Sequence, residues 1–125
     1  MNLGWLKFGE FGLVKEEIAL IKKSIGSRKL KVIIETCYLT AEEKKIASML
    51  VVEGKADFVK TSTGFGSGGA TFEDIELISN VIQNKIKIKA SGGIKDKKTA
   101  QRYLDMGVSR LGTSSGITIV KDINR

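Results

Sequence analysis

One lysine, Lys60, stands where a short apolar segment gives way to a glycine-rich one. Phe58 and Val59 precede it, as expected of a buried strand, and glycine recurs between Gly64 and Gly69. A lysine at such a junction has its stem among apolar groups and its amine at the mouth of a loop. Burial disfavours the charged form of an amine, so the neutral nucleophile becomes more available. The segment therefore allows a Schiff-base lysine, and the alternative is a strand-end lysine whose amine simply reaches water.

A second lysine, Lys89, ends another expected strand. It alternates with isoleucines, as Lys85 and Lys87 do, and this pattern is also typical of an ordinary half-exposed strand. If Lys89 lies beside Lys60 at the loop-side end, a second ammonium group there favours the neutral form of the first. Lys87 must then share the face of Lys89, and the sequence does not indicate where its charge lies.

Three loops are rich in glycine and hydroxyl residues, and each follows an expected strand. They are Thr61–Gly69, Ser91–Gly93 and Gly112–Gly116. Backbone N–H groups in glycine loops coordinate phosphate oxygens, although loops also need glycine for their geometry alone. In α/β barrels the carboxyl ends of the strands carry the active site. Two such loops in consecutive units therefore favour a phosphate cup over ordinary turns.

The loops belong to a unit of strand, loop and helix that recurs along the chain. Strands are expected at Leu30–Thr36, Ala56–Thr61, Lys85–Ala90 and Val108–Gly112. Helices are expected over Leu13–Ile25, with an apolar stripe at Leu13, Ile18, Ile21 and Ile25, and after the capping residues Thr40, Thr71 and Asp96. This alternation predicts parallel strands joined by right-handed crossovers. Without proline or a change in composition, residues 1–125 are expected to form a single domain.

Composition excludes several classes of function. The chain has 125 residues, 42% of them hydrophobic, which suffices for one domain with a modest core. It contains no histidine, so histidine catalysis and histidine-ligated metals are excluded, and neither a metal nor another cofactor is expected. Its single cysteine, Cys37, permits no internal disulfide and is interpreted as a packing residue. With no signal peptide and no apolar run of about 20 residues, the expectation is a cytoplasmic protein without a membrane partner.

The net charge of +7 could indicate nucleic acid or a smaller anionic ligand. The lysines are scattered along helix-like segments and do not alternate with aromatic residues in one block. Solvated helix faces account for most of them. A small phosphorylated ligand is therefore the expected partner, and nucleic acid is not.

Five segments together resemble the motifs of the deoxyribose-phosphate aldolase family, in that family's order and spacing. They are Lys31–Thr36, Ala56–Phe65, Gly69–Thr71, Lys89–Ile94 and Arg110–Gly116. Members of the family are (β/α)8 barrels that reversibly cleave 2-deoxy-D-ribose 5-phosphate into acetaldehyde and D-glyceraldehyde 3-phosphate without a metal, in deoxyribonucleotide catabolism. A (β/α)8 barrel takes about 250 residues. The resemblance therefore implies the C-terminal half of a TIM barrel, an α/β fold of about four parallel strands alternating with helices.

The resemblance also implies roles for individual residues. Lys60 matches the Schiff-base lysine of the family, and Lys89 matches the lysine that favours the neutral form of that nucleophile. Glu35 is implied either as a hydrogen-bonding partner behind the site or as a structural residue. The substrate phosphate would meet Gly64, Gly92, Gly93, Ser114 and Ser115.

Parts of the family's barrel have no counterpart in these residues. Residues 2–7 resemble the end of the fourth barrel strand and the loop after it, so the aspartate that assists proton transfer falls before this chain. Four strands cannot close into a barrel, and open edges and faces favour a homo-oligomer or a complex with a complementing N-terminal half. Weak or no activity is therefore expected of the isolated chain. The alternatives are a non-catalytic half-barrel that serves as an assembly module, and another lysine-dependent aldolase that binds phosphate.

Overall fold

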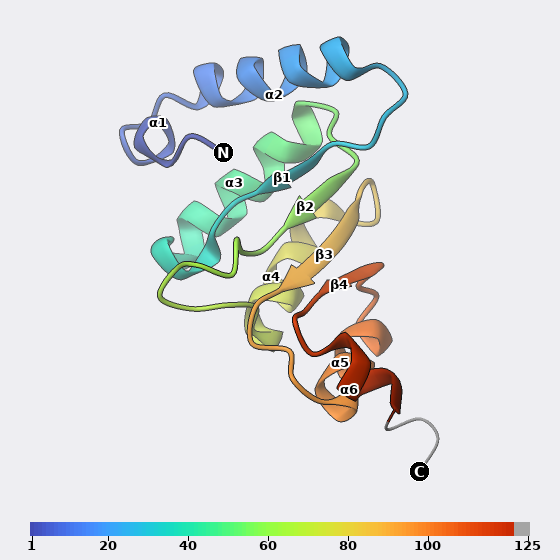
Figure 1. Ribbon diagram of the computed structural model, residues 1–125. Coiled ribbons are helices and arrows are strands. Elements are labelled where there is room, and N and C mark those ends of the chain that lie inside the picture. The colour runs from blue at the N-terminus through green and yellow to red at the C-terminus, as the bar shows by residue number, and fades with distance from the viewer. Residues whose placement is uncertain (122–125) are drawn as a thin grey trace.

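A four-stranded parallel sheet forms the centre of the computed structural model, which describes residues 1–121 (Figure 1). The strands lie in chain order and are β1 (Lys31–Ile33), β2 (Phe58–Lys60), β3 (Lys87–Ser91) and β4 (Arg110–Gly112). The helices between them are α3 (Ala41–Glu53), α4 (Phe72–Ile82) and α5 (Lys97–Asp105). The predicted alternation of four parallel strands with helices is confirmed, although all four strands are shorter than predicted and β3 extends one residue further, to Ser91.

Four further elements complete the described chain: α1 (Leu3–Lys7), α2 (Phe11–Ile25), the 3-10 turn η1 (Thr36–Tyr38) and α6 (Gly116–Lys121). The interpretation of residues 2–7 as a strand end and loop is wrong, because most of this segment is the helix α1. Asn2 caps that helix by accepting a hydrogen bond from the backbone N–H of Trp5 at 3.0 Å. Within residues 1–121 no helix has both the length and the apolar character that a membrane crossing requires.

The predicted helix starts of α3, α4 and α5 are confirmed by their hydrogen bonds. Thr40 accepts from the backbone N–H of Glu43 at 3.2 Å, and the Glu43 carboxylate accepts from the backbone N–H of Thr40 at 2.9 Å. Thr71 and Asp96 accept from backbone N–H groups three positions on. Such caps satisfy N–H groups that the helix itself cannot pair.

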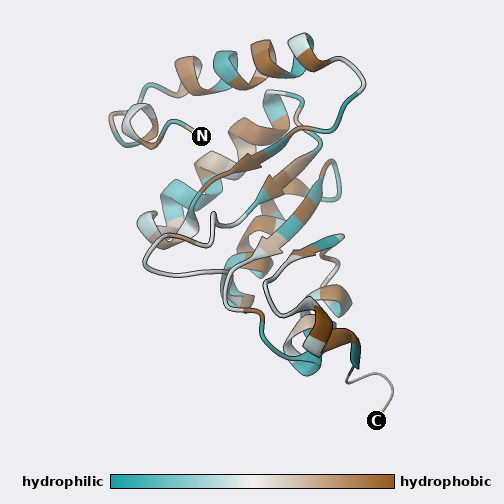
Figure 2. Cartoon of the chain, viewed as in Figure 1, coloured by the Kyte–Doolittle hydropathy of each residue, from teal (hydrophilic) through white to brown (hydrophobic). Residues whose placement is uncertain are grey.

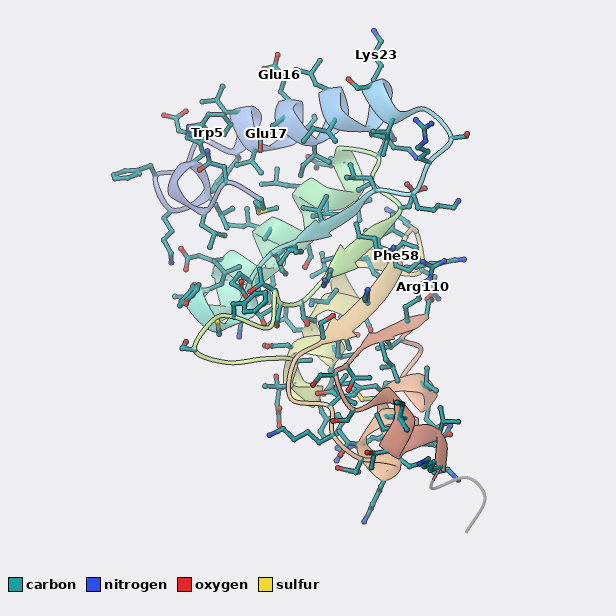
Figure 3. All side chains as sticks on the ribbon, in the orientation of Figure 1. Trp5, Glu16, Glu17, Lys23, Phe58 and Arg110 are labelled. Atoms are coloured by element: carbon teal, nitrogen blue, oxygen red, sulfur yellow. The ribbon has the colours of Figure 1, made fainter. Side chains whose placement is uncertain are left out.

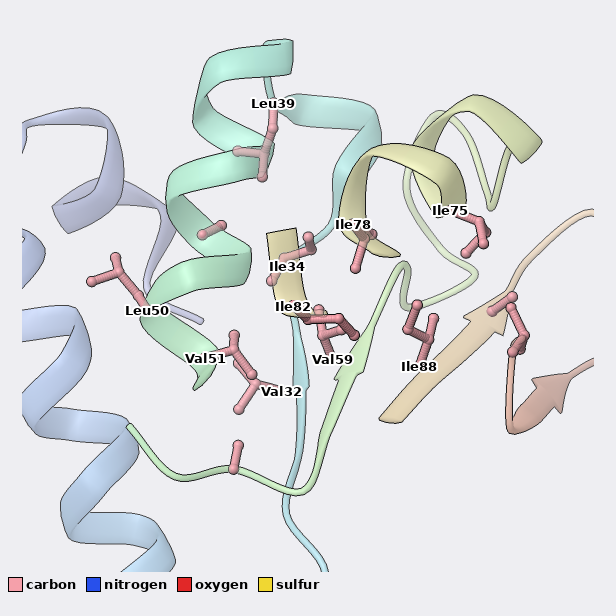
Figure 4. Packing of buried hydrophobic residues seen from close by; sticks show 14 of the residues in the cluster. Val32, Ile34, Leu39, Leu50, Val51, Val59, Ile75, Ile78, Ile82 and Ile88 are labelled. Atoms are coloured by element: carbon pink, nitrogen blue, oxygen red, sulfur yellow. The ribbon is translucent and has the colours of Figure 1, made fainter. Parts of the chain in front are cut away.

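The hydrophobic core lies on one face of the sheet, against α3 and α4 (Figures 2 and 4). Val32, Val59 and Ile88 are register partners on β1, β2 and β3, and all three are buried on this face. They pack with Val51 of α3 and Ile78 of α4 in one continuous cluster. Burying each such side chain contributes about 1.5–3 kcal/mol. The core therefore holds the sheet to its helices and leaves the other face of the sheet free for polar residues.

The apolar stripe predicted for α2 is only partly buried. Ile18 is in the core together with Val14, whereas Leu13 and Ile21 are 43% and 44% exposed. Ile18 lies close against Gly54, the residue that ends α3: a Cβ atom on Gly54 would lie 2.5 Å from Cγ2 of Ile18. Helix α2 therefore buries Val14 and Ile18 and leaves its other large apolar side chains partly exposed.

Asp57 joins three segments at the amino end of the sheet. Its carboxylate accepts a hydrogen bond from Nζ of Lys22 at 2.7 Å and another from the backbone N–H of Leu30 at 2.8 Å. These two hydrogen bonds, that from Lys22 first, lower the pKa of Asp57. Helix α2 is thereby tied to the start of β1 and to the residue that precedes β2.

We expect Asp57→Asn to lower the free energy of unfolding at pH 7 by about 1–2 kcal/mol, because charge-assisted hydrogen bonds are lost. The folded-state pKa of Asp57 is lowered, so its contribution is present above the unfolded value of about 3.9 and is lost as the pH falls through the folded value. Urea unfolding at several pH values measures both effects, and the difference between Asp57→Asn and wild type should shrink in acid.

Glu16→Gln is the matched control, because Glu16 is exposed on the outer side of α2 (Figure 3). It should leave the unfolding midpoint within experimental error. Equal midpoints for wild type and Asp57→Asn at pH 7 would contradict the assigned role.

Candidate active site

Lys60 and Lys89 are direct neighbours across the sheet. The two residues are register partners in the parallel pairing of β2 with β3, and both are half-buried. They occupy the face opposite the core, because their strand neighbours Val59 and Ile88 point into it. The structure thus brings together the two lysines that the sequence singled out.

Positive charge is concentrated on this face. Burial lowers the pKa of Lys89, and the like charges of Lys60, Lys31 and Arg110 lower it further. Within residues 1–121, neither Lys60 nor Lys89 forms an ion pair with a carboxylate. Because like charges repel, these neighbouring cations disfavour the charged form of Lys89.

The ring of Phe58 lies under three of the cations on this face. Nζ of Lys31 is 5.6 Å from the ring centroid, Nζ of Lys87 is 6.0 Å from it, and the guanidinium carbon of Arg110 is 5.0 Å from it. Phe58 is only 2% exposed, and Figure 3 labels it next to Arg110. Lys87 therefore does share the face of Lys89, and its charge lies over an aromatic ring, which attracts cations.

Sequence reasoning missed Lys31 and Arg110 as members of this site. Both stand inside the motifs that carry the family resemblance, and each begins a strand. Both lie on the sheet face that carries Lys60 and Lys89, which we call the lysine face. This position follows from register, because Lys31 pairs with Phe58 and Arg110 pairs with Lys89. The available signal was the alternation of residues along each strand.

Lys60 lines a cavity of about 460 Å³ whose walls are the three predicted glycine-rich loops. Of the residues predicted to bind phosphate, Gly64, Gly92, Gly93 and Ser114 line this cavity. Ser115 is not in the lining. Its backbone N–H donates to Oγ1 of Thr113 at 2.9 Å, and its carbonyl accepts from the N–H of Ile119 at 3.0 Å, at the start of α6. Lys95, which was not predicted, adds a positive charge to the wall.

Two glycines allow the loops to pass close to one another. A Cβ atom on Gly69 would lie 2.5 Å from the carbonyl carbon of Gly92, and the adjacent N–H of Ala70 donates to the carbonyl of Ser91 at 2.9 Å. A Cβ atom on Gly112 would overlap Oγ of Ser91 and lie 3.3 Å from Cε of Lys89. Glycine is therefore needed at positions 69 and 112 to form the cavity.

Glu35 holds the loop after β2 from the neighbouring strand. It is buried and has a left-handed backbone with φ of 53°. Its carboxylate accepts from the backbone N–H of Thr63 at 3.1 Å and from the Thr63 hydroxyl at 2.6 Å. Oγ1 of Thr63 then accepts from the N–H of Phe65 at 3.1 Å. Glu35 thus contacts a loop that lines the cavity and makes no hydrogen bond to either lysine.

The site also contains a buried serine that sequence reasoning treated only as part of a loop. Ser91 lines the cavity and is 4% exposed, and its hydroxyl has no hydrogen-bond partner within the described chain. An unpartnered hydroxyl cannot be detected from sequence, because it depends on which groups the fold brings within reach.

Comparison with known proteins agrees with this geometry. Residues 9–123 match the family described as DeoC/LacD family aldolase. A protein of Coprothermobacter proteolyticus named "Deoxyribose-phosphate aldolase" is 50% identical over 123 residues, which are 98% of this chain and 56% of that protein. One of the same name from Brevibacillus brevis is 52% identical over 120 residues, which are 96% of this chain and 54% of that protein.

Solved structures agree with the fold. "QR15, an Aldolase" superposes with a TM-score of 0.93 at 44% identity, over 98% of this chain and 56% of that one. The tetrameric deoxyribose phosphate aldolase from Aeropyrum pernix gives a TM-score of 0.80 at 26% identity, over 88% of this chain and 48% of that one. The chain spans about half the length of these relatives, so the predicted half-barrel fold is confirmed. By motif, fold and sequence, the chain belongs to the DeoC/LacD family of aldolases.

Proposed function

We propose that this chain carries the lysine side of a Schiff-base aldolase site, a lyase that cleaves 2-deoxy-D-ribose 5-phosphate into D-glyceraldehyde 3-phosphate and acetaldehyde. The observation that carries the proposal is the pairing of Lys60 with Lys89 at the carboxyl end of the sheet, where Lys60 lines a cavity. Family membership and the names of the relatives support it. A cytoplasmic location and a role in deoxyribonucleotide catabolism are parts of the same proposal.

The reaction begins when the neutral amine of Lys60 attacks the aldehyde carbon of the open-chain sugar. Loss of water gives an iminium ion, which accepts the electron pair of the C2–C3 bond as that bond breaks. The C3 hydroxyl loses its proton as C3 becomes the aldehyde carbon of the departing glyceraldehyde 3-phosphate. The remaining enamine is protonated, and hydrolysis releases acetaldehyde and regenerates the amine. Lys89 is assigned the role of the amine that assists Lys60, because the two residues are register partners across the sheet.

The phosphate is assigned to the glycine-rich loops. Gly64, Gly92, Gly93 and Ser114 line the cavity with Lys60, so they can anchor the end of the substrate remote from the reacting carbon. Ser115 contributes indirectly, because it directly precedes α6 and its carbonyl accepts a hydrogen bond from the N–H of Ile119 in that helix.

Glu35 supports one of these loops, the one that follows β2. Its two hydrogen bonds to Thr63 hold the loop after β2 against the neighbouring strand. We therefore assign Glu35 the role of a positioning residue that does not touch the substrate.

The open sheet bears on how active the chain is. β1 and β4 are the edge strands of the described sheet, and four strands cannot close a barrel. The proposal therefore treats residues 1–125 as one half-barrel domain whose lysine face is completed by a second copy or by a complementing N-terminal half. Alone, the chain is proposed to form the Schiff base but to turn over slowly or not at all.

Reductive trapping tests the nucleophile directly. With acetaldehyde and borohydride, the wild-type chain should carry one ethylated lysine, located at Lys60 by mass mapping, because the reduced Schiff base cannot hydrolyse. Lys60→Ala should abolish this label. Lys23→Ala is the control, because Lys23 is exposed near the end of α2 and makes no contact with the site (Figure 3).

A label spread over surface lysines, or an unchanged label in Lys60→Ala, would remove Lys60 as the nucleophile. It would favour the non-catalytic assembly module. Trapping that is stronger with other aldehydes than with acetaldehyde would instead favour a different lysine-dependent aldolase.

The cations around Lys89 predict a charge effect. Arg110→Gln removes a fixed positive charge, so the pKa of Lys89 should rise towards its usual value. NMR titration of isotope-labelled lysine side chains measures this change. Arg102→Gln is the matched control, because Arg102 also lies over a phenylalanine, at 3.8 Å from the Phe72 ring, but on α5. A pKa of Lys89 that is unchanged or lower in Arg110→Gln would show that the guanidinium does not act on it.

A further inference from the structure

Ser91 combines deep burial with a hydroxyl that nothing in the described chain satisfies. The residue is 4% exposed, and its Oγ has no hydrogen-bond partner among residues 1–121. A buried hydroxyl without a partner destabilises the fold relative to a paired one. One other hydroxyl is in the same condition, that of Thr36, but Thr36 does not line the cavity. Ser91 does line it, together with Lys60.

The backbone of Ser91 is held firmly although its side chain is free. Its N–H donates to Oγ1 of Thr61 at 3.1 Å, and its carbonyl accepts from that same hydroxyl at 3.2 Å. The carbonyl also accepts from the N–H of Ala70 at 2.9 Å. The hydroxyl is therefore presented on a fixed backbone, which reduces the entropy lost when it binds a ligand.

The position of Ser91 decides which part of a ligand it meets. On β3 it follows Lys89 on the same face of the strand and is followed directly by Gly92. It pairs in register with Gly112, whose missing side chain leaves room for both Oγ of Ser91 and Cε of Lys89. Ser91 thus lies between the lysine pair and the glycine loop to which the phosphate is assigned.

We propose that the Ser91 hydroxyl binds a hydroxyl group of the substrate's carbon chain, between the carbon that reacts with Lys60 and the phosphate. The proposal rests on the proposed function, because a sugar phosphate carries hydroxyl groups between its aldehyde and its phosphate. Binding exchanges an unsatisfied buried group for a satisfied one. Ser91 is then a substrate-binding residue that contacts the hydroxylated part of the ligand and contacts neither its aldehyde carbon nor its phosphate.

The first test is one of stability and needs no ligand. Ser91→Ala removes a hydroxyl that has no partner, so its urea midpoint should equal or exceed that of wild type. Ser62→Ala is the control: Ser62 is also buried and non-helical, and its Oγ donates to Oγ1 of Thr61 at 3.1 Å. Its midpoint should fall. A fall in Ser91→Ala as large as that in Ser62→Ala would show that the Ser91 hydroxyl is engaged in the fold, which overturns the proposal.

The second test measures ligand recognition by borohydride trapping at Lys60. In Ser91→Ala, the concentration of 2-deoxy-D-ribose 5-phosphate that gives half-maximal labelling should rise about fivefold, the effect of one neutral hydrogen bond. The concentration of acetaldehyde required should not change, because acetaldehyde has no hydroxyl group. Competition by inorganic phosphate should not change either, because the glycine loops are intact.

The outcomes separate this proposal from the one on which it rests. If wild type is not labelled at Lys60, the proposed function fails and the role of Ser91 fails with it. If wild type is labelled and Ser91→Ala binds the sugar phosphate equally well, only the role of Ser91 is overturned. The role of Ser91 is also overturned if Ser91→Ala needs an equally higher concentration of acetaldehyde for half-maximal labelling, because the effect would then lie at the aldehyde end. Weaker competition by inorganic phosphate would overturn it as well, because the effect would then lie at the phosphate end.

Discussion

The register between β2 and β3 is the constraint on which the site depends. It places Lys60 directly beside Lys89 on a partly buried surface, where the neighbouring positive charge contributes to the lowered pKa of Lys89. A shift by one residue would turn Lys60 into the core and Val59 out of it, because side chains alternate between the faces of a strand. The core contacts of Val59 and Ile88 therefore also hold the lysine pair in place. Packing on one face of the sheet thus maintains an unfavourable electrostatic arrangement on the other.

The lysine face accommodates its charge without carboxylates. Phe58 offers a ring face to three cations, and this attraction offsets part of their mutual repulsion. Elsewhere in the described chain, lysines pair with acids in the usual way, as Lys22 does with Asp57 and Lys44 with Asp74. The contrast has a chemical consequence, because a carboxylate beside a lysine favours the charged form of the amine, which is not a nucleophile.

Unfavourable local features gather at the carboxyl end of the sheet. Glu35 has a left-handed backbone, the hydroxyl of Ser91 has no partner in the described chain, and burial lowers the pKa of Lys89. Each destabilises the fold, and each lies in or beside the cavity. The amino end shows the opposite character, with Asp57 satisfied by Lys22 and by the N–H of Leu30. This division is common in enzymes, where strain and unsatisfied groups persist at sites that act on ligands.

Local patterns in the sequence predicted the class of fold and singled out the two lysines as candidates. Alternation of strands and helices, the caps Thr40 and Thr71, and the glycine loops all act over a few residues, so they can be recognised without a structure. Tertiary structure alone decided that Ser115 lies outside the cavity, that Lys87 lies over an aromatic ring and that the hydroxyl of Ser91 has no partner. These facts depend on strand register and on how close separate loops approach, and both are set by contacts between residues far apart in the chain. Local periodicity determines which elements form, whereas long-range packing determines which of their side chains meet.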